Sequence, residues 1–361
     1  MTVNDKTLTS GDSSKNLQAG NDITNINNYG LSTSDVIEII KTVGKAELLQ
    51  LFMDNFTVMK NLAKEIADDR AKEITNEFNE KLLAQEEDVI LKVHKRLSQP
   101  DMQSAFFEAQ KGYAKTGDKN KSNLLTDLLI NKGKENNGTL KDYLIDEAIE
   151  ITAKLTSKQL DLLSLLQLRN TANNSVNSIE ILKQWIIDIY SPFQDCLPIS
   201  IQNLEYLEQM NCISIIPHYL TFNSSFLSNF KNSYKGIFAS GFTNEEVEDI
   251  FSLEKNSILI IPCLNDNSLY QINALNDKDL ENMFEVNNVP EDRQSVIKEY
   301  FDRVLTDEEI KIKITELAPF MEKIMNISKE TNYCRLNPLG TIIALSNIKA
   351  KTNKVVAWDF S

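Results

Sequence analysis

The chain has 361 residues, of which 42 % are hydrophobic and 25 % are charged, a composition typical of folded globular proteins. Its formal net charge of −14 opposes binding to the phosphates of nucleic acids and to anionic lipid surfaces, so both are disfavoured as partners. The length predicts two folded domains beside a tail and excludes a chain that is disordered throughout.

The first 30 residues are rich in Gly and Asn and contain a short repeat. Gly11–Ala19 and Gly20–Asn28 are consecutive units of equal length, with Gly at the first position, Asn at the sixth and an aliphatic residue at the seventh. So few units bury too little apolar surface to be stable alone. Residues 1–30 are therefore either a flexible tail or a β-arc element that stacks with copies from other chains. In the second case the oligomerisation residues are Gly11, Asn16, Leu17, Gly20, Ile23, Asn25 and Ile26.

A helical domain is predicted over residues 31–192, beginning at the capping pattern Ser32-x-x-Asp35. Residues 48–97 are expected to form one long helix or two in tandem. Their apolar residues recur at near-heptad spacing, at Leu62, Ile66, Ile74, Phe78, Leu82, Val89 and Val93. This face is expected either to pack on the protein itself or to form an intermolecular coiled coil.

The next segments predict a helical bundle. Residues 101–116 and 121–135 are expected to form a hairpin around Gly117-Asp118, and residues 160–168 a buried helix. Capping patterns at Thr139-x-x-Asp142 and Thr156-x-x-Gln159 mark further helix starts. Two stripes are predicted to be buried, namely Leu140, Leu144, Ala148, Ile151 and Leu155, and Ile179, Leu182, Ile186 and Ile189.

Residues 193–361 are predicted to form an α+β domain. Short β-branched runs at 213–216, 258–261 and 269–272 indicate strands, and the last two are close enough for a hairpin. Thr243-x-x-Glu246 and Thr306-x-x-Glu309 open further helices, and Pro319 should interrupt the second. A helix at 338–349, a basic turn and a strand at 355–358 would resemble a winged-helix module. The expected fold is mainly α, with a multi-helical body and a smaller α+β C-terminal region.

No catalytic centre is recognisable. Gly112-x-x-x-x-Gly117-Asp118-Lys119 has the glycine spacing of a phosphate-binding loop, but an Asp stands where a Lys is needed, so we interpret it as a turn between helices. With four spaced cysteines and two histidines, we expect reduced thiols, no metal and no cofactor. His218 could meet Cys212 in space as base and nucleophile, but a single His and a single Cys among apolar residues are usually core residues.

Two features bear on location and partners. No apolar signal segment or membrane-spanning stretch is visible, so a cytoplasmic protein is expected. Three lysines near the C-terminus, Lys349, Lys351 and Lys354, form either a solvated turn or a contact for a phosphate or an acidic partner.

Two stretches resemble known families. The opening, Gly11-Asp12-x-Ser14-x-Asn16-x-Gln18-Ala19-Gly20-x-Asp22-Ile23, resembles the repeat that starts an uncharacterised family of bacterial proteins of about this length. That likeness continues at Ala109–Lys119, Ser191–Phe193 and Gly241–Thr243. The segment Leu336-Asn337-Pro338-Leu339-Gly340-x-x-x-Ala344 is similar to the Leu-Thr-Pro-x-Gly segment of the abortive-infection alpha proteins, with Asn337 in place of the Thr. Asn can cap the following helix as Thr does.

The second resemblance implies bacterial defence against phage. We therefore expect a non-enzymatic defence protein that acts as a homo-oligomer and senses or binds a phage or host protein. One alternative is an enzyme effector with an unrecognised active site. Another is a regulator that binds nucleic acid through the winged-helix-like module.

Overall fold

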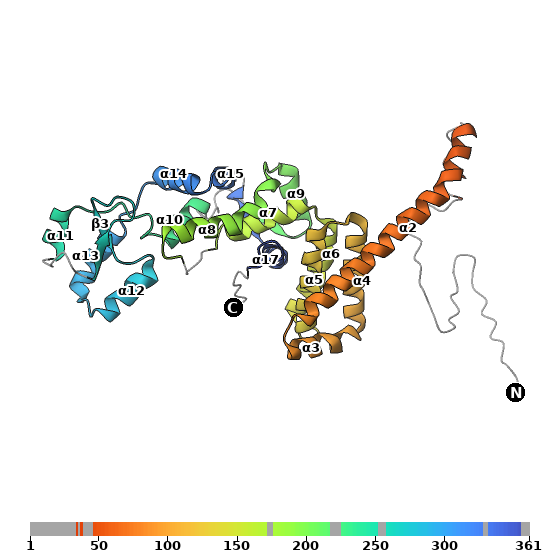
Figure 1. Cartoon of the computed structure of the whole chain (residues 1–361), viewed down its shortest axis with the longest axis horizontal. Coiled ribbons are helices and arrows are strands. Elements are labelled where there is room, and N and C mark those ends of the chain that lie inside the picture. Colours follow the sequence, from red (N-terminus) through yellow and green to blue (C-terminus); the bar gives the residue numbers. More distant parts are fainter. Residues whose placement is uncertain are drawn as a thin grey trace. The chain divides into compact units, whose positions relative to one another are not determined.

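The structure is a computed structural model that describes residues 34, 37–38, 46–171, 176–216, 225–251, 258–327 and 331–354 (Figure 1). The repeat predicted within residues 1–30, His218 and the strand predicted at 355–358 lie outside these ranges. Contacts within the chain divide it into two units, residues 1–65 and 66–361. In the described ranges, no helix has the length and apolar character needed to cross a bilayer.

The described chain is mainly α-helical, as predicted, with two small sheets. The first helices are α2 (Ala46–Leu83), α3 (Glu87–Leu97), α4 (Pro100–Thr116), α5 (Lys119–Lys134), α6 (Leu140–Lys154), α7 (Ser157–Leu168) and α8 (Ile179–Tyr190). The predicted long helical region at 48–97 is thus two helices in tandem, and the predicted hairpin around Gly117 is α4 and α5.

The C-terminal region alternates short helices with strands, also as predicted. Its helices are η1 (Ser191–Cys196), α9 (Ile201–Gln209), α10 (Phe226–Ser233), α11 (Asn244–Phe251), α12 (Asp277–Val286), α13 (Glu291–Phe301), α14 (Asp307–Leu317), α15 (Met321–Asn326) and α17 (Pro338–Thr352). Its strands are β1 (Ile213–Ile215), β2 (Ile260–Pro262), β3 (Tyr270–Ile272) and β4 (Cys334–Leu336). Pro319 separates α14 from α15, so the predicted interruption is confirmed.

Local capping explains where many of these helices begin. The Thr156 hydroxyl accepts from the Gln159 backbone while the Gln159 side chain accepts from the Thr156 backbone, and Thr306 and Glu309 repeat this arrangement. The Thr139 hydroxyl accepts from the backbone N–H of Asp142 at 3.1 Å. These predicted helix starts are confirmed.

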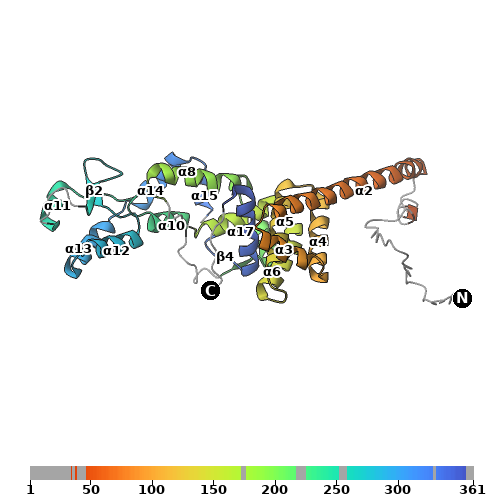
Figure 2. The same ribbon diagram turned by 60° about the horizontal axis from the view of Figure 1, so that its bottom comes forward.

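Helix α17 lies at the centre of the larger core. It packs against α5, α6 and α7, and Figure 1 shows it almost end-on beside α7. Figure 2 shows its length, with β4 leading into it. This core contains buried residues from Ile74 to Ile348, so residues on both sides of position 192 contribute to it. The predicted boundary at 192 remains a prediction about independent folding, but both of its sides contribute to one core.

The close approach of α17 to the chain before β1 requires a glycine. A Cβ added at Gly340 would lie 1.9 Å from the backbone oxygen of Cys212. Asn337 occupies the N-cap position of α17, but its side chain makes no capping hydrogen bond. It instead accepts from the Ser214 hydroxyl at 2.7 Å and donates to the Asn211 side chain at 3.2 Å. Gly340 and Asn337, both from the segment Leu336–Ala344, thus connect α17 to the residues in and just before β1.

The two sheets differ in how far apart their strands lie in sequence. β2 and β3 form the predicted antiparallel hairpin, whereas β1 pairs antiparallel with the distant β4. A second, smaller core lies within residues 242–301 and includes Phe242, Leu280 and Phe301. The two ends of this segment lie next to each other. Ala239 pairs with Val304 there, and the Leu305 N–H donates to the Phe238 backbone oxygen at 2.8 Å.

Candidate functional site

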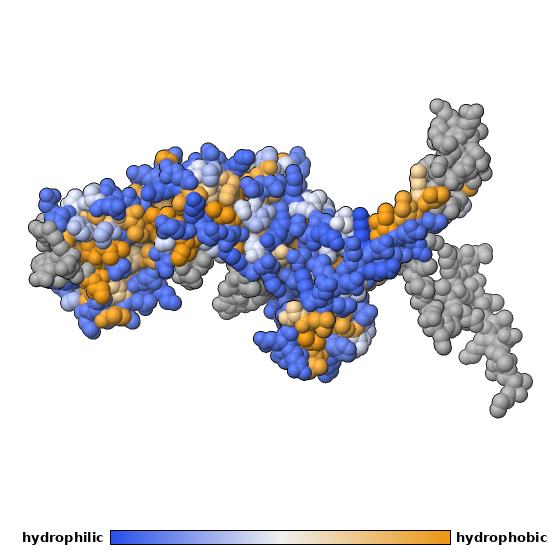
Figure 3. Space-filling model, in the orientation of Figure 1, coloured by the Kyte–Doolittle hydropathy of each residue, from blue (hydrophilic) through white to orange (hydrophobic). Residues whose placement is uncertain are grey.

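The apolar face of α2 changes from exposed to buried along the helix. Ile74, Phe78 and Leu82 are buried in the larger core. Leu62 and Ile66, from the same predicted stripe, are 55 % and 42 % exposed. Val58 and Met59 are exposed as well, and Figure 3 shows the resulting apolar band along α2. The stripe therefore packs on the protein in its second half and is open in its first half.

The exposed side chains form a continuous row. A helix turns by about 100° per residue, so Val58, Leu62 and Ile66, four positions apart, follow one another with a drift of about 40° per step. Met59 widens the row by one position. A cluster of large apolar side chains on one helix face is typical of an interaction surface, whereas single exposed apolar residues are common on any protein. We call Val58, Met59, Leu62 and Ile66 the α2 stripe.

The three C-terminal lysines are all paired within the chain. The Nζ atoms of Lys349, Lys351 and Lys354 lie 3.6, 2.7 and 2.7 Å from carboxylate oxygens of Asp127, Asp161 and Asp188 respectively. These aspartates belong to α5, α7 and α8, so the lysines hold the end of α17 against three helices. Lys351 is mostly buried, and only Lys349 and Lys354 keep substantial exposure for a contact with a partner.

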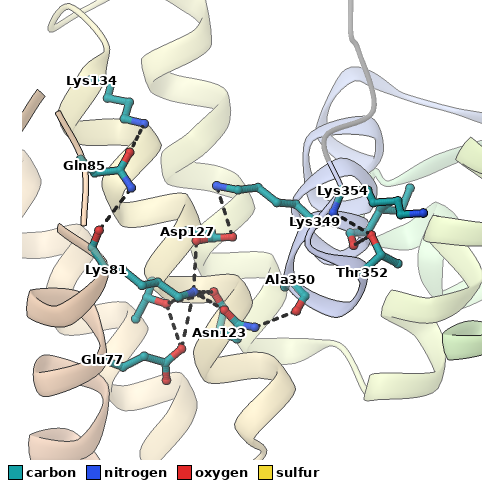
Figure 4. A network of polar contacts seen from close by, with 12 residues as sticks. Glu77, Lys81, Gln85, Asn123, Asp127, Lys134, Lys349, Ala350, Thr352 and Lys354 are labelled. Carbon is teal, nitrogen blue, oxygen red and sulfur yellow. Dashed lines mark hydrogen bonds and ion pairs between the residues drawn. The ribbon is translucent and has the colours of Figure 1, made fainter. Parts of the chain in front are cut away.

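Lys349 belongs to a polar network that connects α2, α5 and α17 (Figure 4). At its centre, the Lys81 Nζ lies 3.1 Å from Asp127 and 3.5 Å from Glu77, and it donates to the Asn123 backbone oxygen at 2.7 Å. The Asn123 amide in turn donates to the backbone oxygen of Ala350 at 2.7 Å. Every charge named here has a partner of opposite charge, so the network stabilises the packing of three helices.

A second charged cluster is buried between α3, α4, α5 and α6. The fully buried Lys132 lies 3.1 Å from Asp142, 2.8 Å from Asp146 and 3.3 Å from Asp101, and Arg96 bridges Asp101 and Asp142. Burial alone would lower the pKa of Lys132, but its hydrogen bonds to Asp146 and Asp142 outweigh burial and raise that pKa. Burial raises the pKa of Asp146. Both cations of the cluster thus have acidic partners, and its three carboxylates exceed its two cations by one.

Of the candidate pair Cys212 and His218, only Cys212 lies among the described residues. Cys196, Cys212, Cys263 and Cys334 are free and buried. Burial raises the pKa of Cys212 to about 12, so its thiol stays protonated near neutral pH. Among the described residues, no group of three His, Cys, Asp or Glu side chains is arranged to hold a metal ion.

The glycine pattern at 112–119 is a helix–helix turn, as interpreted from the sequence. Gly117 ends α4 with a left-handed φ of 64°, and Asp118 caps α5 by accepting from the backbone N–H of Asn120 at 3.0 Å. Gly112 lies inside α4, where a Cβ would be 2.6 Å from that of Ala153. These glycines serve packing and chain reversal.

Comparison with known proteins adds a family. No curated protein and no solved structure matches the chain. A protein-family model matches residues 30–361, and its description gives no activity. The match covers nearly all of the chain outside the predicted repeat. The chain therefore belongs to this uncharacterised family.

Proposed function

We propose that this protein is a non-enzymatic homo-oligomer of bacterial defence against phage, and that it acts by binding a protein partner. The observation that supports assembly is the α2 stripe, which the described chain leaves open although the same helix is well packed further on. The 38 residues of α2 span about 57 Å, enough for two such helices to lie side by side over several turns. The defence role rests on the resemblance at Leu336–Ala344.

The pairing of the three C-terminal lysines with aspartates disfavours the alternative of nucleic-acid binding. Because Lys349, Lys351 and Lys354 each face an aspartate, they supply little uncompensated positive charge for a phosphate backbone. The net charge of −14 acts in the same direction. A protein partner is therefore the better proposal, and the predicted repeat in residues 1–30 would add to self-association.

The test of assembly is the mass of the full chain in solution, measured by light scattering. We expect a multiple of the 41.0 kDa chain mass. Leu62→Glu with Ile66→Glu should lower this mass, because two carboxylates would be buried in an apolar contact. Val286→Glu, at a residue that is also exposed but lies on α12, serves as the matched control and should leave the mass unchanged.

Deletion of residues 1–30 tests the contribution of the repeat and should also reduce the mass. A wild-type chain that is monomeric at micromolar concentration would rule out the assembly proposal. The defence role is measured separately, as phage plaque counts on bacteria that express each variant. Wild type and Val286→Glu should reduce plaques, and the α2 double variant should not. Equal plaque counts with and without the wild-type protein would rule out the defence proposal.

A further inference from the structure

An open cavity of about 430 Å³ lies where the end of α7, strand β4 and the first turn of α17 meet. This volume is within the range of sites for small molecules. Its polar lining consists of two arginines, three amides and a hydroxyl, from Arg169, Arg335, Gln167, Asn170, Asn332 and Thr341. None of the described residues that line it is acidic, although Asp and Glu outnumber Lys and Arg by 52 to 38 in the chain.

Arg169 is a buried cation whose hydrogen-bond acceptors are neutral. It is 4 % exposed, and its guanidinium donates to the backbone oxygens of Thr331 at 2.8 Å and Cys334 at 2.9 Å. Its Nε has no hydrogen-bond partner within the described part of the chain. Among the described residues no carboxylate lies within ion-pair distance of it, whereas the similarly buried Arg96 and Lys132 each pair with at least two aspartates. A buried charge without a counter-charge is costly.

Arg335 supplies the accessible part of the same positive region. It occupies the exposed middle position of β4, between Cys334 and Leu336. Its side chain makes no hydrogen bond or ion pair with another described residue, and its guanidinium carries five N–H donors that a ligand could use. A guanidinium presents paired donors that match the two oxygens of a carboxylate or phosphate.

We propose that this cavity binds a small organic anion that carries a carboxylate or phosphate group on a partly apolar body. Arg335 donates to the anionic group, and Arg169 provides fixed positive charge behind it. The amides of Gln167, Asn170 and Asn332 supply further donors and acceptors around the ligand. The described residues that line the cavity all belong to one chain and none lies on α2, so this proposal does not rest on the proposed self-assembly.

The test is thermal unfolding of the full chain with sodium phosphate, with sodium benzoate, or with sodium chloride at matched ionic strength. We expect phosphate, benzoate or both to raise the unfolding midpoint in a saturable manner, and chloride to have no such effect. A response to phosphate alone assigns a phosphorylated ligand, and a response to benzoate alone assigns a carboxylate with an apolar body.

Arg335→Gln shows whether such a response comes from the cavity. This exposed substitution should leave the midpoint without ligand unchanged and raise the apparent dissociation constant roughly tenfold or more. Lys311→Gln, at a cation on α14 that does not line the cavity, should retain wild-type binding. The proposal is overturned if neither anion acts beyond chloride, or if Arg335→Gln binds as tightly as the wild type.

Discussion

Single residues fix how α17 meets its neighbours. Gly340 is the clearest case, because the Cys212 backbone oxygen occupies the space that any side chain would need. From the sequence, this glycine was recognisable only as part of a short motif. The reason for it depends on a contact with a segment far away in the chain, which no local pattern contains.

Gly340→Ala should therefore destabilise the protein although alanine favours helices. We expect a loss of about 1–3 kcal/mol in the free energy of unfolding, the usual cost of forcing extra atoms into a packed core. Urea unfolding followed by circular dichroism measures the loss. An increase in stability, as expected from helix propensity alone, would contradict the close contact with Cys212.

The lowered pKa of Asp101 predicts that the free energy of unfolding depends on pH. Burial would raise its pKa, but the hydrogen bond and charge of Lys132, together with Arg96, outweigh burial and hold the pKa below its ordinary value of 3.8. The stabilising contribution of this carboxylate is therefore complete above its unfolded pKa and disappears as the pH falls through the lower, folded pKa.

Asp101→Asn removes that contribution and serves as the test. The wild type should be more stable than the variant at pH 6, and the difference should shrink as the pH approaches 2.5. Urea unfolding at a series of pH values gives the free energies, and Asp69→Asn, at an exposed carboxylate on α2, controls for loss of charge. A difference that stays constant over this range would show that Asp101 does not titrate as proposed.

At the scale of elements, sequence patterns predicted where helices begin better than which of their residues are buried. The capping residues Thr156 and Thr306 identified helix starts because a cap acts within one turn. The prediction that Leu140 is buried is wrong: it is the first residue of α6 and is 73 % exposed. Leu144 and Ile179, from the predicted stripes, are only partly buried. A stripe shows which residues share a face, but not how far along the helix its neighbour extends.

The same limit applies to strands and polar networks. The β2–β3 hairpin was predictable because its strands are neighbours in sequence, whereas the pairing of β1 with β4 was not. Ser214 and Asn337, which are hydrogen-bonded beside that sheet, are 123 positions apart. The lysines near the C-terminus were visible as a basic cluster, but their aspartate partners come from three other helices.

The network around Lys81 should make a measurable contribution to stability. Lys81→Met keeps much of the side-chain volume but leaves Asp127, which is mostly buried, without its closest cation. We expect a loss of about 1–3 kcal/mol in the free energy of unfolding. Lys72→Met on the same helix removes a largely exposed ion pair with Asp69 and should change stability by less than about 0.5 kcal/mol. Equal effects of the two substitutions would contradict a structural role for the network.

At the scale of the whole molecule, the sequence predicted the mainly α fold and the smaller α+β C-terminal region. It did not reveal that the larger core contains helices from both predicted domains, because α17 reaches α5, α6 and α7 from the far end of the chain. The candidate surfaces were predicted less well. The cavity beside Arg169 combines α7, β4 and α17, so no continuous segment of sequence carries it.

The bridge between Ala239 and Val304 brings together two points of the chain that lie far apart in sequence. Because these two residues are adjacent in space, the segment between them is an insertion whose two ends meet at one point of the fold. A change of length or sequence between these two residues would therefore leave the connectivity of the main helical framework intact.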